Sequence, residues 1–388
     1  MAMSLSQQLE RWQAAGLIDG ATAERIRSWE ARNLGPSAPS LRIPTLVAVS
    51  LGGVLLAAGV LLLVSTHWEA LSPGQQFSLL LALLLVLHGL GAGLGTLLPA
   101  LAVALHGVGS VALGAGIFLT GQIFHLEARW PLGLLLWGLG AGLGWWLLRQ
   151  WPQLALLALL APAWLAGEWL LRCEQVMGTL PRSALLPMAA GLVLTSLAYL
   201  GAAQGPGPCS PPRRVLVWVG GLALPGSAVF WEVTLITPTQ LQAGPGPDAL
   251  LLLLGWSGAL LLPLLAAWRW RGRSIWHLAV AVGWVLAGLA ITFATTRWAV
   301  PLIHYPWWIA GGLLLVGWGV VERRTERINF GAAFIASTVL GFYVSNVMGN
   351  LERSASLVGL GVLFLGGGWG LEVWRRRLLA SMQGKPQP

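Results

Sequence analysis

Residues Gln76–Gln122 read QFSLLLALLLVLHGLGAGLGTLLPALAVALHGVGSVALGAGIFLTGQ, and this stretch decides the fold. Two apolar, glycine-rich segments meet in it at the Leu98-Pro99 corner. Each segment has about 20 residues, the length at which a helix crosses the hydrocarbon core of a bilayer. The stretch therefore predicts a helical hairpin inside a membrane.

The composition of the whole chain agrees with this prediction. The 388 residues have a mean hydropathy of +0.72, with 56% hydrophobic and 10% charged residues, which excludes an ordinary soluble domain. The 51 glycines allow membrane helices to approach closely. The 23 tryptophans suit the two membrane interfaces, where an amphipathic ring is well solvated.

Apolar segments of similar length recur along the chain. We place twelve of them, near residues 44–65, 76–97, 99–122, 131–149, 152–171, 184–202, 215–235, 249–268, 274–296, 302–321, 328–348 and 355–374. A helix satisfies its own backbone hydrogen bonds in lipid. We therefore expect an all-α integral membrane protein of about twelve transmembrane helices, with a short cytosolic N-terminal helical hairpin.

The distribution of Lys and Arg supports this count. With the N-terminus inside, 18 of the 23 basic residues lie in inner segments and 5 in outer loops, as the positive-inside rule requires. We expect a multi-pass protein of the bacterial cytoplasmic (inner) membrane, with both termini cytoplasmic. The net charge of +9 then reflects contacts with anionic lipid headgroups at the inner face and not nucleic acid.

Polar connections divide the chain into parts. Residues 1–43 form a cytosolic helical leader and linker, in which Asp19 is the expected N-cap of the second helix. Residues 44–202 form a first six-span half, and residues 203–214 form a cytosolic linker. Residues 215–388 form a second six-span half with a basic cytosolic C-terminus.

Four motifs in the first part of the chain share their order and spacing with a known family. They are Trp12 with Gly16-Leu-Ile-Asp19, Trp68-Glu-Ala-Leu-Ser-Pro73, Gly114-Ala-Gly-Ile-Phe-Leu-Thr-Gly-Gln-Ile-Phe-His125, and Leu135-Leu-Trp137. Over residues 8 to about 150 the chain resembles the bacterial polytopic membrane-protein family catalogued as domain of unknown function 2157. The resemblance implies a prokaryotic membrane protein with no established activity.

The chain departs from the family pattern at two positions. His67 stands where asparagine is expected, and Phe124 stands where tyrosine is usual. Each change alters what polar groups at the outer face can bind.

His88 and His106 are candidate functional residues inside the hairpin. Each lies nine residues from Leu97 on opposite arms, so the two side chains are expected at matching depth. If they face each other, they form a proton relay or a ligand pair. The alternative is two separate neutral histidines, each hydrogen-bonded to a carbonyl, to Ser110 or to water.

A second group of ionisable and polar residues falls at the expected outer face. Convergence of the spans would make it a vestibule for a cation, a proton or a polar solute; its candidates are His67, Glu69, Gln122, His125, Glu168 and Glu232, with His304 at the same face. In the alternative, these groups are satisfied at the interface. Glu168 then pairs with Arg172 four residues away, while Gln122 and His125 cap the end of their helix.

Neither metal nor catalytic signatures stand out. The spacings of His125 with Glu127 and of His67 with Glu69 are not ligand spacings on a helix. The sequence contains no nucleophile elbow, zinc-protease motif or phosphate-binding loop. We therefore expect no metal, no cofactor and no catalytic residue.

Three functions are compatible with this sequence. A transporter or channel-like protein for a small solute or ion is the first, because of the many spans and the intramembrane histidines. A non-catalytic scaffold or sensor is the second, in which residues 1–40 dock a protein partner. An intramembrane enzyme acting on lipid or envelope precursors is the third.

Overall fold

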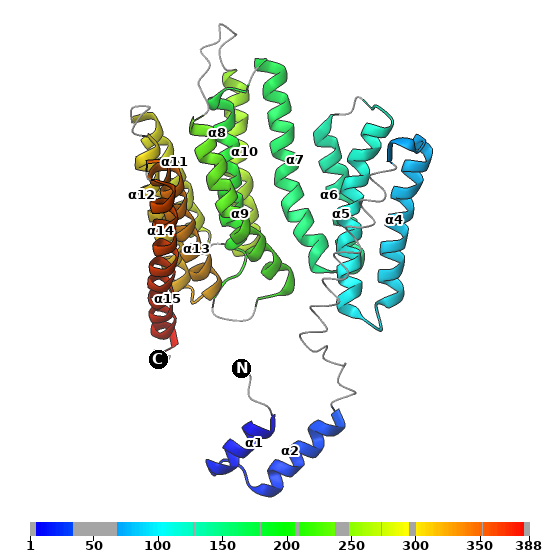
Figure 1. Ribbon diagram of the computed structural model, residues 1–388, viewed down its shortest axis with the longest axis vertical. Coiled ribbons are helices and arrows are strands. Elements are labelled where there is room, and N and C mark those ends of the chain that lie inside the picture. Colours follow the sequence, from blue (N-terminus) through cyan, green and yellow to red (C-terminus); the bar gives the residue numbers. More distant parts are fainter. Residues whose placement is uncertain are drawn as a thin grey trace. The chain divides into compact units, whose positions relative to one another are not determined.

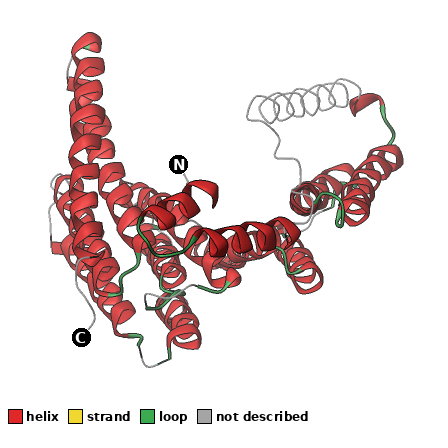
Figure 2. Ribbon diagram, turned by 90° about the horizontal axis from the view of Figure 1, so that it is seen from below, coloured by secondary structure: helices red, strands yellow, loops and turns green. Residues whose placement is uncertain are grey.

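The computed structural model describes residues 5–33, 68–126, 129–178, 180–205, 209–236, 248–272, 274–294, 300–350 and 352–383 (Figure 1). These residues belong to two compact units, Met1–Ser72 and Pro73–Pro388, and each is described by itself. The described residues contain helices and loops but no strand (Figure 2). The first predicted span, 44–65, lies outside them.

The N-terminal unit contains α1 (Leu5–Ala14), α2 (Gly20–Asn33) and the short 3₁₀ helix η1 (Trp68–Ala70). Asp19 caps α2, as predicted, because its Oδ1 accepts a hydrogen bond of 2.8 Å from the backbone N–H of Thr22. Hydrogen bonds from Thr22 lower the pKa of this carboxyl. Leu9 and Ala23 are buried between the two helices.

The second unit is a series of long helices that run side by side (Figure 1). Their bounds are α4 (Pro73–Leu94), α5 (Pro99–Ile123), α6 (Trp130–Leu148), α7 (Trp151–Met177), α8 (Arg182–Leu200), α9 (Pro211–Ile236), α10 (Ala249–Arg271), α11 (Trp276–Ala294), α12 (Val300–Val321), α13 (Thr325–Phe342), α14 (Arg353–Val362) and α15 (Gly368–Gln383). The described residues between these helices form loops and turns, together with the π and 3₁₀ helices that follow α13 and α14.

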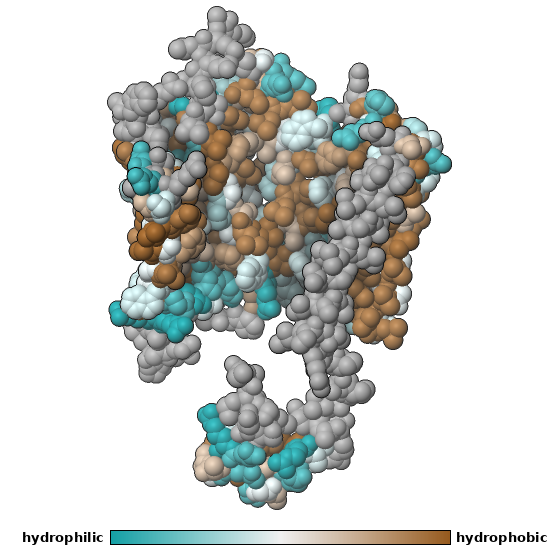
Figure 3. Space-filling view, viewed as in Figure 1, coloured by the Kyte–Doolittle hydropathy of each residue, from teal (hydrophilic) through white to brown (hydrophobic). Residues whose placement is uncertain are grey.

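Ten of the described helical segments are long and apolar enough to cross a membrane. They coincide with predicted spans, and α12 covers the predicted span 302–321 without being among the ten. Figure 3 shows apolar residues around the middle of the second unit and hydrophilic residues near the helix ends. The all-α polytopic fold is therefore confirmed, while the number twelve stays a prediction.

Local sequence signals explain where several helices begin. Proline occupies the first or second position of α5, α6 and α7, where its missing N–H costs no hydrogen bond. The carboxylate of Asp248 caps α10 by accepting from the backbone N–H groups of Leu250 and Leu251 at 2.9 and 3.2 Å. Gly366 and Gly367 lie in a π-helical turn, Leu363–Gly367, which directly precedes α15.

Helix α8 is the most deeply buried of the ten candidate spans. It packs against α9, α10, α11 and α7. Its partner α9 approaches closely because Gly220 has no side chain; a Cβ there would lie 2.7 Å from the Cβ of Tyr199. The predicted linker 203–214 thus joins two helices that pack tightly, and the division into two halves stays a prediction.

Arginine side chains cap the C-terminus of α8. Arg271 donates to the carbonyl of Gly201 at 2.8 Å, and Arg324 donates to that of Gln204 at 2.8 Å. Arg327 donates to the carbonyls of Leu200 and Ala203. Carbonyls at a helix C-terminus have no partner within the helix, and a positive charge there interacts favourably with the negative end of the helix dipole. We call this contact the arginine cap.

Glu322 joins the arginine cap into one network. Its carboxylate accepts hydrogen bonds from Arg271, from Arg327 at 2.7 Å and from the indole N–H of Trp318 at 2.7 Å. Burial alone would raise the pKa of Glu322, but these hydrogen bonds outweigh burial and lower it to about 2. The ring of Trp318 also lies 3.9 Å from the guanidinium carbon of Arg327.

Replacing the carboxylate of Glu322 should destabilise the protein strongly. Glu322→Gln leaves two buried guanidinium groups without a counter-charge, which we expect to cost about 3–5 kcal/mol of unfolding free energy. Thermal unfolding in detergent measures the loss. Glu372→Gln is the matched control, because that carboxylate also accepts from two arginines but is 42% exposed. Equal melting temperatures for the two variants would contradict the proposed importance of the cap.

Cysteine labelling tests the predicted orientation. Cys173 is fully buried, whereas Cys209 in the segment between α8 and α9 is partly exposed. Burial raises the pKa of the Cys209 thiol more than Arg324 and Arg213 lower it, so labelling becomes faster at alkaline pH. An impermeant maleimide should label Cys209 in inside-out vesicles only. A Gln122→Cys variant on a Cys209→Ser background should show the reverse.

Candidate functional site

His88 and His106 contact each other across the α4–α5 hairpin. Their Nδ1 atoms are 3.0 Å apart, and the ring centroids lie 5.3 Å apart with an angle of 29° between the rings. His106 is 5% exposed. The structure therefore brings together the two residues that the sequence places at matching depth, while their function stays a prediction.

Two glycines make room for the two rings. A Cβ on Gly91 of α4 would lie 2.9 Å from the ring of His106, and a Cβ on Gly109 of α5 would lie 2.8 Å from the ring of His88. Each histidine thus rests on the glycine three residues beyond the other histidine. The two rings are fixed by the close approach of the helices.

The sequence contains a repeated pattern that matches this arrangement. Leu87-His-Gly-Leu-Gly91 and Leu105-His-Gly-Val-Gly109 are copies of one pattern, eighteen residues apart. In an antiparallel hairpin, such copies place each histidine against the other copy's glycine. The repeat therefore predicts the reciprocal contact that depth alone leaves open.

Polar groups of α6 and α7 fix the rotation of α5. Trp137 donates from its indole N–H to the carbonyl of Ser110 at 2.7 Å. The amide nitrogen of Gln153 lies 3.5 Å from the hydroxyl of Ser110, which itself donates to the carbonyl of His106 at 2.9 Å. These contacts hold α5 with His106 directed toward α4.

A second hydrogen-bond network links α9, α11 and α12 near the ends of these helices. His304 Nδ1 lies 3.0 Å from Glu232 Oε1, and His304 Nε2 lies 3.2 Å from Thr292 Oγ1. Trp308 donates from its indole N–H to the same Glu232 oxygen at 2.6 Å. His304 is 1% exposed, whereas the side chain of Glu232 is 30% exposed. No local pattern predicts this contact, because 72 residues separate the two partners.

Tryptophans surround this network. Trp307 has its ring centroid 5.6 Å from that of His304 and stacks on Trp284 at 4.1 Å with an angle of 9°. Trp231 is fully buried and packs against Trp307 and Trp308. Aromatic walls keep water away from His304, so its hydrogen bonds to Glu232 and Thr292 are strengthened by the low dielectric.

The predicted outer-face residues do not form one group. Glu168 pairs with Arg129 at the start of α6, and not with Arg172 as the alternative interpretation predicted; it also accepts from Trp164 at 3.3 Å. Gln122 and His125 are exposed at the end of α5. His67 lies outside the described residues, and Glu69 is described in its backbone alone.

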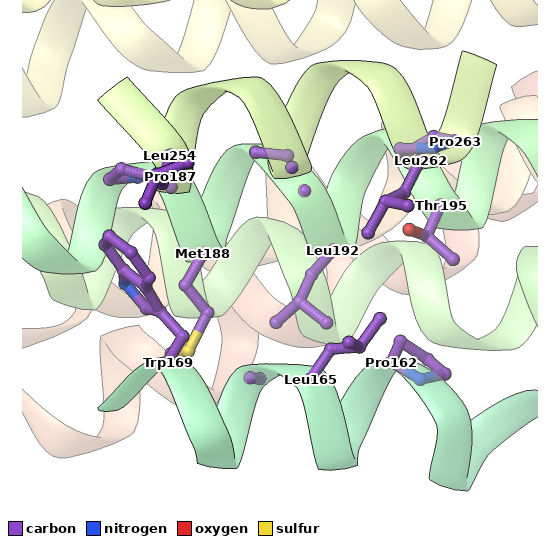
Figure 4. A pocket seen from close by; sticks show the side chains of 15 residues that line it. Pro162, Leu165, Trp169, Pro187, Met188, Leu192, Thr195, Leu254, Leu262 and Pro263 are labelled. Atoms are coloured by element: carbon purple, nitrogen blue, oxygen red, sulfur yellow. The ribbon is translucent and has the colours of Figure 1, made fainter. Parts of the chain in front are cut away.

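Two pockets of the second unit adjoin each other, because both are lined by Leu165, Trp169 and Leu254. One of about 510 Å³ is lined by Arg129, Glu168 and Arg172, but not by Gln122 or Glu232. Another, of about 190 Å³, lies between α7, α8 and α10 and is almost wholly apolar (Figure 4). The walls of these two pockets contain Glu168 but neither Gln122 nor Glu232, and the shared vestibule stays a prediction.

Prolines from three helices line that apolar pocket. They are Pro162 of α7, Pro187 of α8 and Pro263 of α10 (Figure 4). A proline inside a helix leaves the carbonyl four residues earlier unpaired. The freed carbonyl of Ala158 accepts from the hydroxyl of Tyr199 at 3.1 Å, which explains why α7 tolerates Pro162.

The described residues contain no cluster of three or more His, Cys, Asp or Glu side chains that could hold a metal ion. His88 with His106 and His304 with Glu232 are pairs, which lack the four ligands of a structural zinc site. What both pairs can do chemically is share or exchange a proton.

Fold and sites together define an all-α polytopic membrane protein with ionisable pairs inside its helices. A family model described as predicted membrane protein (DUF2157) matches residues 10–154, which confirms the resemblance inferred from the sequence motifs. No curated protein and no solved structure matches the chain. His88 and His106 lie inside the matched residues, while Glu232 and His304 lie outside them.

Adding a methyl group beneath either histidine ring should destabilise the hairpin. Gly91→Ala and Gly109→Ala each force a ring to move, which we expect to cost about 1–3 kcal/mol of unfolding free energy. Gly93→Ala on α4 is the control, since a Cβ there meets nothing within 4 Å. It should be neutral or stabilising by up to about 1 kcal/mol. Equal melting temperatures for the three variants would refute the close contact of the histidine rings with Gly91 and Gly109.

Proposed function

We propose that this chain is a transporter or channel-like protein for a small solute or ion, and that the ion is a proton. The observation that carries the proposal is the hydrogen-bond network of Glu232, His304 and Thr292, which joins α9, α11 and α12. Ionisable groups inside a membrane are costly and mark ion or proton pathways.

Counting hydrogens supports a bound proton. The hydroxyl of Thr292 donates to the carbonyl of Gly288 at 2.8 Å, so its single hydrogen is used. His304 Nε2 must then supply the hydrogen in its contact with Thr292. The hydrogen between His304 Nδ1 and Glu232 is therefore an additional proton, carried either by the carboxyl or by an imidazolium.

Loss of that proton has a defined consequence. An ionised Glu232 requires His304 to donate from Nδ1, which leaves Nε2 as an acceptor in a neutral ring. The hydroxyl of Thr292 then turns from Gly288 to His304. The network thus has two hydrogen-bonded states that differ by one proton, as a proton-binding site in a transporter needs.

Exposure indicates the direction from which the proton arrives. The partly exposed carboxylate of Glu232 is the entry point, and the buried ring of His304 receives the proton from it. The contact between His88 and His106 supports a second proton-binding site. Two Nδ1 atoms 3.0 Å apart share one hydrogen, so one ring carries its hydrogen on Nδ1 and the other on Nε2. The shared hydrogen passes across when one proton enters at Nε2 of the first ring and another leaves from Nε2 of the second.

The remaining predictions on context belong to the same proposal. The protein lies in the bacterial inner membrane with both termini in the cytoplasm, and anionic headgroups contact its arginine-rich inner face. The small solute that accompanies the proton stays open. The scaffold alternative is favoured by the exposed side chains of Trp12, Leu17 and Trp29 in the N-terminal unit, which offer a docking surface for a protein partner.

Proton flux into liposomes tests the proposal. The purified full chain is reconstituted with a pH-indicator dye inside, and a potassium diffusion potential drives the flux. Wild type should acidify the interior faster than protein-free liposomes do. Glu232→Gln and His304→Gln should slow the flux by at least about tenfold, because each removes one half of the proton site.

Two controls make the result specific. Glu168→Gln removes another carboxylate near a helix end, one that pairs with Arg129, and should leave the flux unchanged. Deletion of residues 1–40 should also leave the flux unchanged, which separates transport from docking by the leader. The proposal fails if wild type matches protein-free liposomes, or if Glu232→Gln retains the full rate.

A further inference from the structure

A cavity of about 580 Å³ lies between α11 and α12, with walls from α8, α9 and α13. Small-molecule sites in proteins have volumes of roughly 300–1,000 Å³ and mainly apolar walls. The walls here are leucine, valine, glycine and the rings of Trp276, Trp284 and Trp318. His277 is the ionisable residue among them.

The ring of His277 is held in place but lacks hydrogen bonds. Its side chain is 10% exposed, and neither ring nitrogen has a hydrogen-bond partner among the described residues. The ring lies between two indoles, with centroids 3.6 Å from Trp276 and 5.1 Å from Trp318. A buried polar group without a partner costs about 1–3 kcal/mol. A ligand that supplies the partner would recover this loss.

The neighbouring charges fix which hydrogen the ligand must bring. His277 Nδ1 lies 3.6 Å from Glu322 Oε1, and Glu322 is ionised within the arginine cap. A hydrogen on Nδ1 directed toward this carboxylate is favoured over a lone pair. Nε2 is then a bare acceptor, so the ligand must offer an O–H or N–H group.

We propose that this cavity binds a long-chain carboxylic acid, with its chain along the apolar walls and its carboxyl hydrogen on His277 Nε2. The acid keeps this hydrogen and donates a hydrogen bond to Nε2, while the Nδ1–H of the neutral ring faces Glu322.

The surrounding charge selects an acid. Arg271 of α10 and Arg327 of α13 share the single carboxylate of Glu322, so this end of the cavity has an excess of positive charge. Such an excess attracts the partly negative oxygen atoms of a carboxyl head group. The site lies at the opposite ends of α11 and α12 from Thr292 and His304, and its occupancy does not depend on proton flux.

Photolabelling of the full chain in detergent tests the site. The probe is palmitic acid with a diazirine in its chain, and labelled peptides are identified by mass spectrometry. Label should concentrate on α11 and α12. Excess palmitic acid should compete it away, whereas methyl palmitate, which has no O–H, should compete at least about tenfold less effectively.

Matched glycine variants locate the chain of the ligand. Gly317 lines the cavity and a Cβ there meets nothing within 4 Å, so Gly317→Phe fills the space without a clash and should abolish labelling. Gly283 of α11 is equally open but does not line the cavity, so Gly283→Phe should label like wild type.

A variant of His277 tests the contact between the carboxyl group of the ligand and the imidazole ring. His277→Leu should abolish the preference for the acid over the ester while the chain still labels α11 and α12. Equal competition by acid and ester in wild type overturns the proposal. Labelling spread evenly over the lipid-facing helices, or retained in Gly317→Phe, overturns it as well.

Discussion

The most deeply buried of the candidate spans, α8, ends inside the protein, and the arginine cap stabilises that end. A helix C-terminus presents carbonyls without partners, which lipid cannot satisfy. Guanidinium groups from α10, from α13 and from the turn before it satisfy these carbonyls. Buried guanidinium groups in turn need a counter-charge, and Glu322 between α12 and α13 provides it. One set of contacts therefore fixes the positions of α8, α10, α12 and α13 relative to each other.

Hydrophobic length is a local property, and for this reason the sequence predicts the helices of this fold well. The segments from 76–97 to 355–374 are helices in the structure, and Asp19 caps α2 as expected. The sequence predicts the lateral position of each helix much less well. A uniformly hydrophobic helix carries little information about which of its faces contacts which neighbouring helix. The contact of Glu232 with His304 depends on that rotation and joins residues 72 positions apart. Nothing within either helix predicts it.

The predicted vestibule illustrates the same limit of sequence analysis, which does not give the lateral position of a helix. The sequence places Glu168, Glu232 and Gln122 near the ends of their helices, where the structure also has them. Two residues at the same depth are not necessarily in contact, however. Glu168 meets Arg129, because the N-terminus of α6 lies beside α7, and this contact replaces the pairing with Arg172 expected from spacing. His88 and His106 are the exception. A hairpin with a short corner constrains both depth and neighbour, and the repeated His-Gly-x-Gly pattern fixes the rotation as well.

The polar groups inside this protein share one physical solution. A single charge in lipid is expensive, so each ionisable group is placed where a second group can share its proton or its charge. His304 has Glu232, His88 has His106, and the guanidinium groups have Glu322. His277 alone among these histidines faces its charged neighbour at 3.6 Å, too far for a hydrogen bond, while both of its nitrogens stay unpaired. Because the other sites satisfy the rule within the chain, the exception beside an apolar cavity is the place where a molecule from outside completes it.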